Sequence, residues 1–100
     1  MEEEKKYERE KIAVVTGGVR GIGLGISLAL KKKGYRVYAL YSKDEKSAAA
    51  AQGEGVIPVK ADVRNEAEIV AFFSVLRHVD VLVNNAGIAV AAQLQDTSAE

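Results

Sequence analysis

The fold is decided by residues 16–23, TGGVRGIG, which lie between the apolar run IAVV (12–15) and the stretch LGISLAL (24–30). A glycine-rich turn from a strand to a helix directs free backbone N–H groups outward at the carboxyl edge of a parallel sheet. The helix N-terminus adds a partial positive charge, so an anion is favoured there. Gly17 permits the tight turn, Gly21 permits close approach of a phosphate, and Gly23 permits close helix packing. Taken alone, the glycine spacing is a weak signal, and a plain connecting turn is the alternative interpretation.

Apolar strands alternate with helical patterns along the rest of the chain. Predicted strands cover residues 11–17, 35–41, 56–63 and 79–87, and predicted helices cover about 22–33, 44–52 and 65–79. The strands are apolar at nearly every position, as expected of strands covered on both faces. Asn65 is placed to cap the third helix, with Glu68 three residues later in the capping position. This alternation predicts an α/β fold with a parallel sheet and right-handed crossovers.

Length and composition limit the functions that this chain can have. Its 100 residues suffice for one small domain, and 48% of them are hydrophobic. Fourteen basic and fourteen acidic residues cancel, so no overall charge favours nucleic acid or an anionic membrane. Cysteine is absent, and the single His78 has no ligand partner at suitable spacing, so no metal site is predicted. The charged start has no apolar signal core, so a cytoplasmic protein is expected.

Three motifs in order resemble the cofactor-binding half of the short-chain dehydrogenase/reductase family. They are TGGVRGIG after the first strand, ADV (61–63) after the third, and NNAG (84–87) after the fourth. The resemblance covers residues 11–100 and is closest to the NADP-preferring ketoacyl-carrier-protein reductase subgroup. It implies a half-Rossmann three-layer sandwich with four parallel strands in the order 3-2-1-4 and about three helices. Residues 1–10 are then a charged arm, and 11–100 a truncated dinucleotide-binding half-domain.

The resemblance assigns cofactor-binding roles at both ends of the dinucleotide. It implies that Asp62 accepts a hydrogen bond from the adenine amino group, with Val63 beside the ring, and that Asn84 ties strand ends together. An aspartate or an Asn-Asn-Ala-Gly run at a strand end can also be only a turn cap. The residues implied near the pyrophosphate and adenosine are Gly17, Val19, Arg20, Gly21, Ile22 and Gly23, and those near the nicotinamide ribose are Asn85, Ala86 and Gly87.

The end of the second strand favours NADP, although NAD remains possible. An NAD-binding member carries an acidic residue there to hold the ribose 2′-OH. This chain has Ser42 followed by Lys43, and Arg20 lies in the glycine turn, where a guanidinium can bind a phosphate with two hydrogen bonds. The alternative is that both cations are ordinary solvated charges, partly offset by Asp44 and Glu45.

No catalytic residue is predicted in this chain. The resemblance implies a catalytic Ser and a Tyr-x-x-x-Lys pair after a fifth strand, and the sequence stops at Glu100. Tyr7 and Lys11 have the same spacing, but they precede the first strand and so approach the sheet at the edge opposite the cofactor. The expected function is therefore the cofactor-binding portion of a short-chain oxidoreductase without turnover of its own.

Two other interpretations stay open. One is a stand-alone nucleotide-binding or regulatory module, and the other is a reduced or designed scaffold without activity. In each case the fourth strand lies at a sheet edge, where unpaired backbone groups favour further pairing. Residues 79–83 are therefore expected to support self-association or binding of a missing C-terminal half.

Overall fold

Strand β1, Ile12–Thr16, is an interior strand of a four-stranded parallel sheet. The computed structural model describes residues 10–85 of the chain. All five residues of β1 are buried, because β1 pairs on both sides and is covered on both faces. The sheet has the order β3-β2-β1-β4, with β2 at Arg36–Tyr41, β3 at Ile57–Lys60 and β4 at Val81–Asn84. The predicted parallel sheet and its strand order are confirmed.

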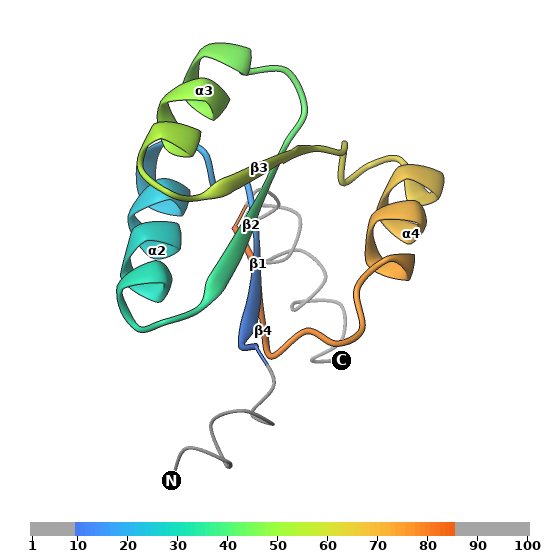
Figure 1. Cartoon of the computed structure of the whole chain (residues 1–100). Coiled ribbons are helices and arrows are strands. Elements are labelled where there is room, and N and C mark those ends of the chain that lie inside the picture. The colour runs from blue at the N-terminus through green and yellow to red at the C-terminus, as the bar shows by residue number, and fades with distance from the viewer. Residues whose placement is uncertain (1–9, 86–100) are drawn as a thin grey trace, which may run out of the picture.

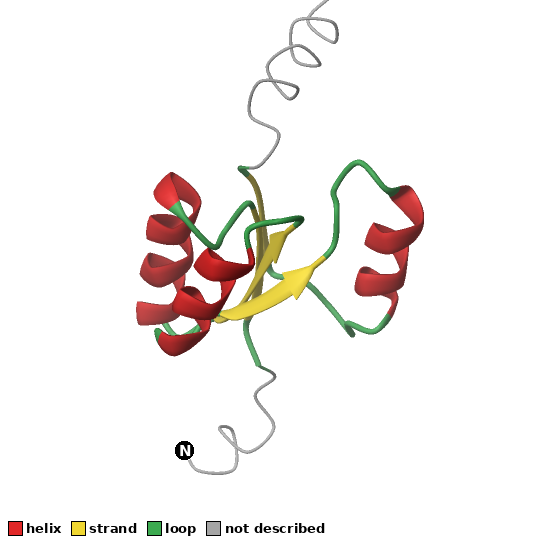
Figure 2. Ribbon diagram, turned by 90° about the horizontal axis from the view of Figure 1, so that it is seen from above, coloured by secondary structure: helices red, strands yellow, loops and turns green. Residues whose placement is uncertain are grey.

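In the described part of the chain, three helices cover the sheet and make it the middle of three layers. Helices α2 (Gly21–Lys32) and α3 (Glu45–Gly53) lie on one face, and α4 (Glu66–Ser74) lies on the other (Figures 1 and 2). Each helix connects two parallel strands, as expected for βαβ units. The carboxyl ends of β1, β2 and β3 therefore meet at one edge, where three loops come together.

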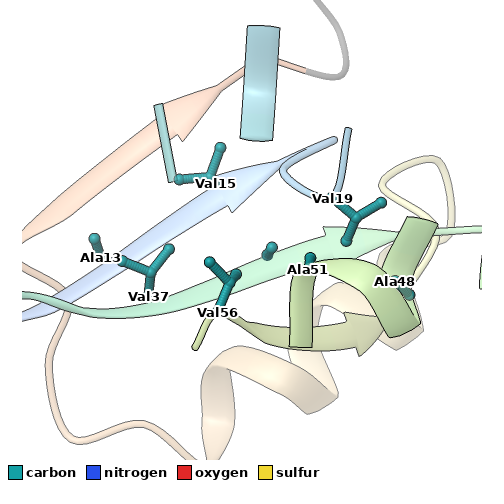
Figure 3. Close-up of a cluster of buried hydrophobic side chains, with 8 residues drawn as sticks. Ala13, Val15, Val19, Val37, Ala48, Ala51 and Val56 are labelled. Carbon is teal, nitrogen blue, oxygen red and sulfur yellow. The ribbon is translucent and has the colours of Figure 1, made fainter. Parts of the chain in front are cut away.

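Small aliphatic side chains fill the core on the α2 and α3 face. Ala13 and Val15 of β1 and Val37 of β2 are buried together with Ala48 and Ala51 of α3 (Figure 3). Alanine at these helix positions lets α3 approach the sheet closely. On the opposite face, Val14 and Leu40 pack against Ile69, Phe72 and Phe73 of α4.

The ends of α4 show one correct and one wrong boundary prediction. The Asn65 side chain accepts a hydrogen bond from the Glu68 N–H at 3.2 Å, so the predicted cap is confirmed. The helix ends at Ser74, however, and not at residue 79. The chain turns at Val75, which lets Leu76 and Val79 pack against the sheet.

Strands β3 and β4 are shorter than the predicted ranges of 56–63 and 79–87. After Ala61 the chain leaves the sheet, because the Asp62 backbone and side chain accept hydrogen bonds from the Asn65 and Arg64 N–H groups. Residues 86 and 87 lie outside the described residues. Within residues 10–85, α2 is the longest helix at 12 residues, and none of the helices could cross a membrane.

Candidate functional site

Two glycines with positive φ shape the turn between β1 and α2. Gly17 has a φ of 63° and donates its N–H to the Leu40 carbonyl at 2.8 Å, which joins the turn to β2. Gly21 has a φ of 59°, and a Cβ added there would meet no atom within 4 Å. Residues other than glycine rarely adopt a backbone conformation with positive φ, because their Cβ is hindered there. Gly21 thus leaves open space beside the first N–H groups of α2, where an anion can approach.

Two other glycines are required by close contacts. A Cβ on Gly18 would lie 2.7 Å from the Ser27 Oγ, a buried hydroxyl that donates to the Gly18 carbonyl at 3.0 Å. The sequence analysis missed this role, although the tandem Gly17-Gly18 was a signal for it. A Cβ on Gly23 would collide with the Gly17 carbonyl oxygen and lie 2.6 Å from Asn85 Nδ2. Gly23 therefore makes room for the turn and for Asn85, whereas we expected it to serve helix packing.

A cavity of about 450 Å³ lies at the carboxyl ends of β1, β2 and β3. Its volume falls within the range of roughly 300–1,000 Å³ found for ligand pockets. The predicted site residues that line it are Gly17, Val19, Arg20, Ser42, Lys43, Asp62 and Val63. Five further lining residues were not assigned to the site from the sequence, namely Leu40, Tyr41, Asp44, Ala61 and Arg64.

Four further predicted site residues are described but do not line this cavity, namely Gly21, Ile22, Gly23 and Asn85. Gly21, Ile22 and Gly23 form the first turn of α2, and the side chain of Ile22 is exposed. Asn85 contacts the glycine turn through its Nδ2, which donates a hydrogen bond to the Gly17 carbonyl at 3.2 Å. Ala86 and Gly87 lie outside the described residues. Asn84 accepts a hydrogen bond from Thr16 Oγ1 at 3.1 Å, which connects the ends of β4 and β1 as expected.

Arg20 and Asp44 both line the cavity and form an ion pair, with Arg20 NH1 3.2 Å from Asp44 Oδ2. Asp44 is also the N-cap of α3 and accepts hydrogen bonds from the Ser47 N–H and Oγ at 2.9 and 2.8 Å. These two bonds, the N–H first, lower the pKa of Asp44 more than Arg20 does. The hydrogen bonds from Ser47 therefore keep the Asp44 carboxyl group ionised at neutral pH whether or not Arg20 remains beside it.

A second ion pair joins Asp62 to Arg64. The Arg64 side chain donates from Nε and NH2 at 3.1 and 2.9 Å, and its backbone N–H donates to Asp62 Oδ1 at 2.9 Å. These bonds, the side-chain ones first, lower the pKa of Asp62 from 3.8 to about 2. The two side-chain hydrogen bonds from Arg64 reach the two oxygens of Asp62 and so fix the orientation of the carboxylate. The short spacing of Asp62 and Arg64 in the sequence was the available signal for this turn.

The lining suits a ligand with an anionic part and an apolar part. Arg20, Lys43 and Arg64 supply positive charge that exceeds the charge of the two carboxylates in the lining, and the exposed Val63 supplies apolar surface. The glycine turn offers backbone N–H groups at the N-terminus of α2, a common phosphate site. No group of His, Cys, Asp and Glu among residues 10–85 is arranged to hold a metal ion. An adenine nucleotide therefore fits the residues present by charge, size and surface type.

The Tyr-x-x-x-Lys spacing at the start of the chain lies away from this cavity. Tyr7 is outside the described residues, and Lys11 directly precedes β1, at the edge opposite the cavity. The Lys11 Nζ lies 5.5 Å from the centre of the Tyr35 ring, which is a cation–π contact at the surface. Lys11 is thus separated from the cavity by the length of β1.

Comparison with known proteins gives matches along most of the chain. A family model described as short chain dehydrogenase matches residues 11–100. The acetoacetyl-CoA reductase of Shinella zoogloeoides is 46% identical over 83 residues, which is 78% of this chain and 34% of that protein. The chain thus spans about a third of the length of the curated relatives it matches.

Solved structures agree with the fold. The RhlG/NADP active-site complex from Pseudomonas aeruginosa matches with a TM-score of 0.62 and 34% identity, over 75% of this chain and 34% of that one. An actinorhodin polyketide ketoreductase with NADPH matches with a TM-score of 0.63 and 34% identity, over 76% and 33% of the two chains.

Proposed function

The chain belongs to the short chain dehydrogenase family, and we propose that its carboxyl-edge cavity binds the adenosine half of NADP. One observation carries the proposal: Arg20, Lys43 and Arg64 surround a cavity of about 450 Å³ at the strand ends, and Ser42 directly follows β2. An acidic residue in the place of Ser42 would repel a 2′-phosphate. The NADPH and NADP in two similar solved structures support the same choice of cofactor.

The chain's residues would divide the nucleotide between them. Arg20, Lys43 and Ser42 would hold the 2′-phosphate, because guanidinium, ammonium and hydroxyl groups all donate to phosphate oxygens. Asp62 would accept from the adenine amino group, with Val63 against the ring. The pyrophosphate would lie at the first turn of α2, beside Gly17, Gly21, Ile22 and Gly23, and the nicotinamide ribose would lie near Asn85, Ala86 and Gly87.

The reaction class follows from the family and from two similar proteins. When bound, the nicotinamide group supplies hydride transfer to or from a carbonyl or alcohol carbon. The names acetoacetyl-CoA reductase and polyketide ketoreductase support carbonyl reduction, close to the ketoacyl reductase subgroup. Residues 1–100 lack a Ser and a Tyr-x-x-x-Lys pair at the expected positions, so we expect this stretch alone to bind cofactor without sustained turnover.

A fluorescence titration of the 100-residue chain with NADPH and with NADH tests the proposal. Saturable binding that favours NADPH supports it, provided that circular dichroism shows a folded sample. No binding of either nucleotide by a folded chain overturns the assignment of the cavity. Equal binding of both overturns the assignment of the 2′-phosphate site but leaves dinucleotide binding in place.

The edge of β4 supports a second proposal, that this strand pairs with a further strand from another copy or from a C-terminal half. Within residues 10–85, β4 pairs only with β1. Its Leu82 side chain is 58% exposed and lines an apolar cavity of about 190 Å³ together with Ile69 and Phe73 of α4. Exposed apolar side chains along an unpaired strand edge favour association.

A further inference from the structure

The two carboxylates and three cations of the cavity are not equally available to a ligand. Asp62 binds Arg64 through two side-chain bonds, and Asp44 binds Arg20 through one contact of 3.2 Å. Among residues 10–85, no carboxylate forms an ion pair with Lys43. A dianionic group that enters the cavity therefore finds Lys43 accessible, while Arg20 is already engaged.

The two partners in the Arg20–Asp44 pair differ in how firmly they are held. The Asp44 side chain is 30% exposed and receives two hydrogen bonds from Ser47. The Arg20 side chain is 75% exposed, and it takes part in no capping hydrogen bond at the start of α2. Because Asp44 is fixed at the N-terminus of α3, any rearrangement of the pair must come from Arg20.

We propose that Asp44 determines how strongly this site prefers NADP over NAD, by competing with the 2′-phosphate for Arg20. The inference rests on the proposed dinucleotide site. A phosphate must draw Arg20 away from a fixed carboxylate, and the same carboxylate repels the phosphate. NAD has a hydroxyl at this position and bears neither cost. Asp44 thus weakens the binding of NADP but not that of NAD. The difference between the affinities for NADP and NAD is therefore smaller than Arg20 and Lys43 alone would produce.

The test substitutes Asp44→Asn in the full 100-residue chain. An asparagine keeps an oxygen that can cap α3 and removes the charge, so we expect this variant to fold. Glu45→Gln is the matched control, because it removes the same charge one residue away. Glu45 pairs with Lys60 at 2.8 Å and does not line the cavity. Asp44→Ser, which also caps a helix without a charge, is the second variant if Asp44→Asn does not fold.

The probes are adenosine 2′-monophosphate and adenosine 5′-monophosphate, followed by NADPH and NADH, in calorimetric titrations. We expect Asp44→Asn to bind the 2′-monophosphate about threefold to tenfold more tightly, with a change of about twofold or less for the 5′-monophosphate. The gain should become smaller when Arg20→Ala is added, because Asp44→Asn then has no Arg20 to release and removes only the direct repulsion of the phosphate.

Other results would contradict either the competition between Asp44 and the 2′-phosphate or the dinucleotide site itself. Equal gains in Asp44→Asn and Glu45→Gln, or a gain of the same size with and without Arg20, would overturn the competition for Arg20 and leave the dinucleotide site intact. An unchanged affinity of a folded Asp44→Asn chain for adenosine 2′-monophosphate would also overturn the competition and leave the dinucleotide site intact. If the unsubstituted chain binds none of the four probes, the proposed function itself fails, and the inference fails with it.

Discussion

The side-chain amide of Asn85 donates a hydrogen bond to the carbonyl of Gly17 at 3.2 Å and so joins the end of β4 to the turn after β1. The two residues are 68 positions apart in the chain. Gly23 lies between them, since a Cβ there would meet both the Gly17 carbonyl and the Asn85 amide. The glycine turn is thus supported by an interior strand, an edge strand and a helix, which fixes the backbone that faces the cavity.

Gly23→Ala should therefore destabilise the chain, whereas Gly25→Ala in the same helix should not. We expect Gly23→Ala to lower the free energy of unfolding by about 3 kcal/mol, because backbone must move to admit the methyl group. A Cβ on Gly25 would meet nothing within 4 Å, so this substitution should raise the free energy of unfolding by about 0.5–1 kcal/mol. Urea denaturation followed by circular dichroism measures both. Equal effects at the two positions would refute the close contact at Gly23.

Arg20→Ala should weaken NADPH binding more than NADH binding. Loss of one charge-assisted contact to the 2′-phosphate is expected to raise the NADPH dissociation constant about tenfold and that of NADH about twofold or less. Lys31→Ala, which removes a cation at the far end of α2, is the control. Parallel fluorescence titrations check the result. Equal losses for the two nucleotides would remove the phosphate-binding role of Arg20.

Arg64→Gln should raise the pKa of Asp62 from about 2 toward its ordinary value of 3.8. The rise should be partial, because the backbone N–H of residue 64 still donates to Asp62 Oδ1. A pH titration of the Asp62 carboxyl carbon by NMR measures it. Arg77→Gln, at a residue that does not line the cavity, should leave this pKa unchanged.

The same ion pair predicts a pH dependence of stability. The folded-state pKa of Asp62 lies below its ordinary value, so its contribution is complete above about pH 3.8 and is lost as the pH falls through about 2. The stability difference between the unsubstituted chain and Arg64→Gln should therefore shrink across this interval. Urea denaturation at several pH values measures the difference, and one that stays constant down to pH 2 would contradict the assignment of the low pKa to Arg64.

Most of the fold was predictable from the sequence, because its main signals are local. Apolar runs such as IAVV marked the strands, and the alternation with helices required parallel pairing. The cap at Asn65 followed from the spacing to Glu68. The end of α4 was not predictable, since residues 75–79 continue a helical apolar pattern. Their position depends on packing of Leu76 and Val79 against the sheet, which is a tertiary effect.

The candidate site was predictable only where the glycine, aspartate and asparagine motifs mark it. The cavity collects Arg20, Lys43 and Asp62 from three separate loops, as their positions after successive strands predicted. The pairing of Arg20 with Asp44 was not predictable, because it depends on how the turn after β1 faces the start of α3. The paired hydrogen bonds from the Arg64 guanidinium to the Asp62 carboxylate also depend on side-chain orientation, which sequence spacing does not define.

The edge of β4 gives the last prediction, a self-association that depends on Leu82. If another strand pairs with this edge, Leu82→Lys should place a charge in the contact and raise the dissociation constant of the dimer about tenfold. Val75→Lys is the matched control, because Val75 is 76% exposed but follows α4 and lies outside the apolar cavity beside β4. Sedimentation equilibrium over a range of concentrations measures both variants. We expect dimers for the unsubstituted chain and for Val75→Lys, and a shift to monomers for Leu82→Lys. An unsubstituted chain that stays monomeric at the highest concentration would contradict self-association through β4.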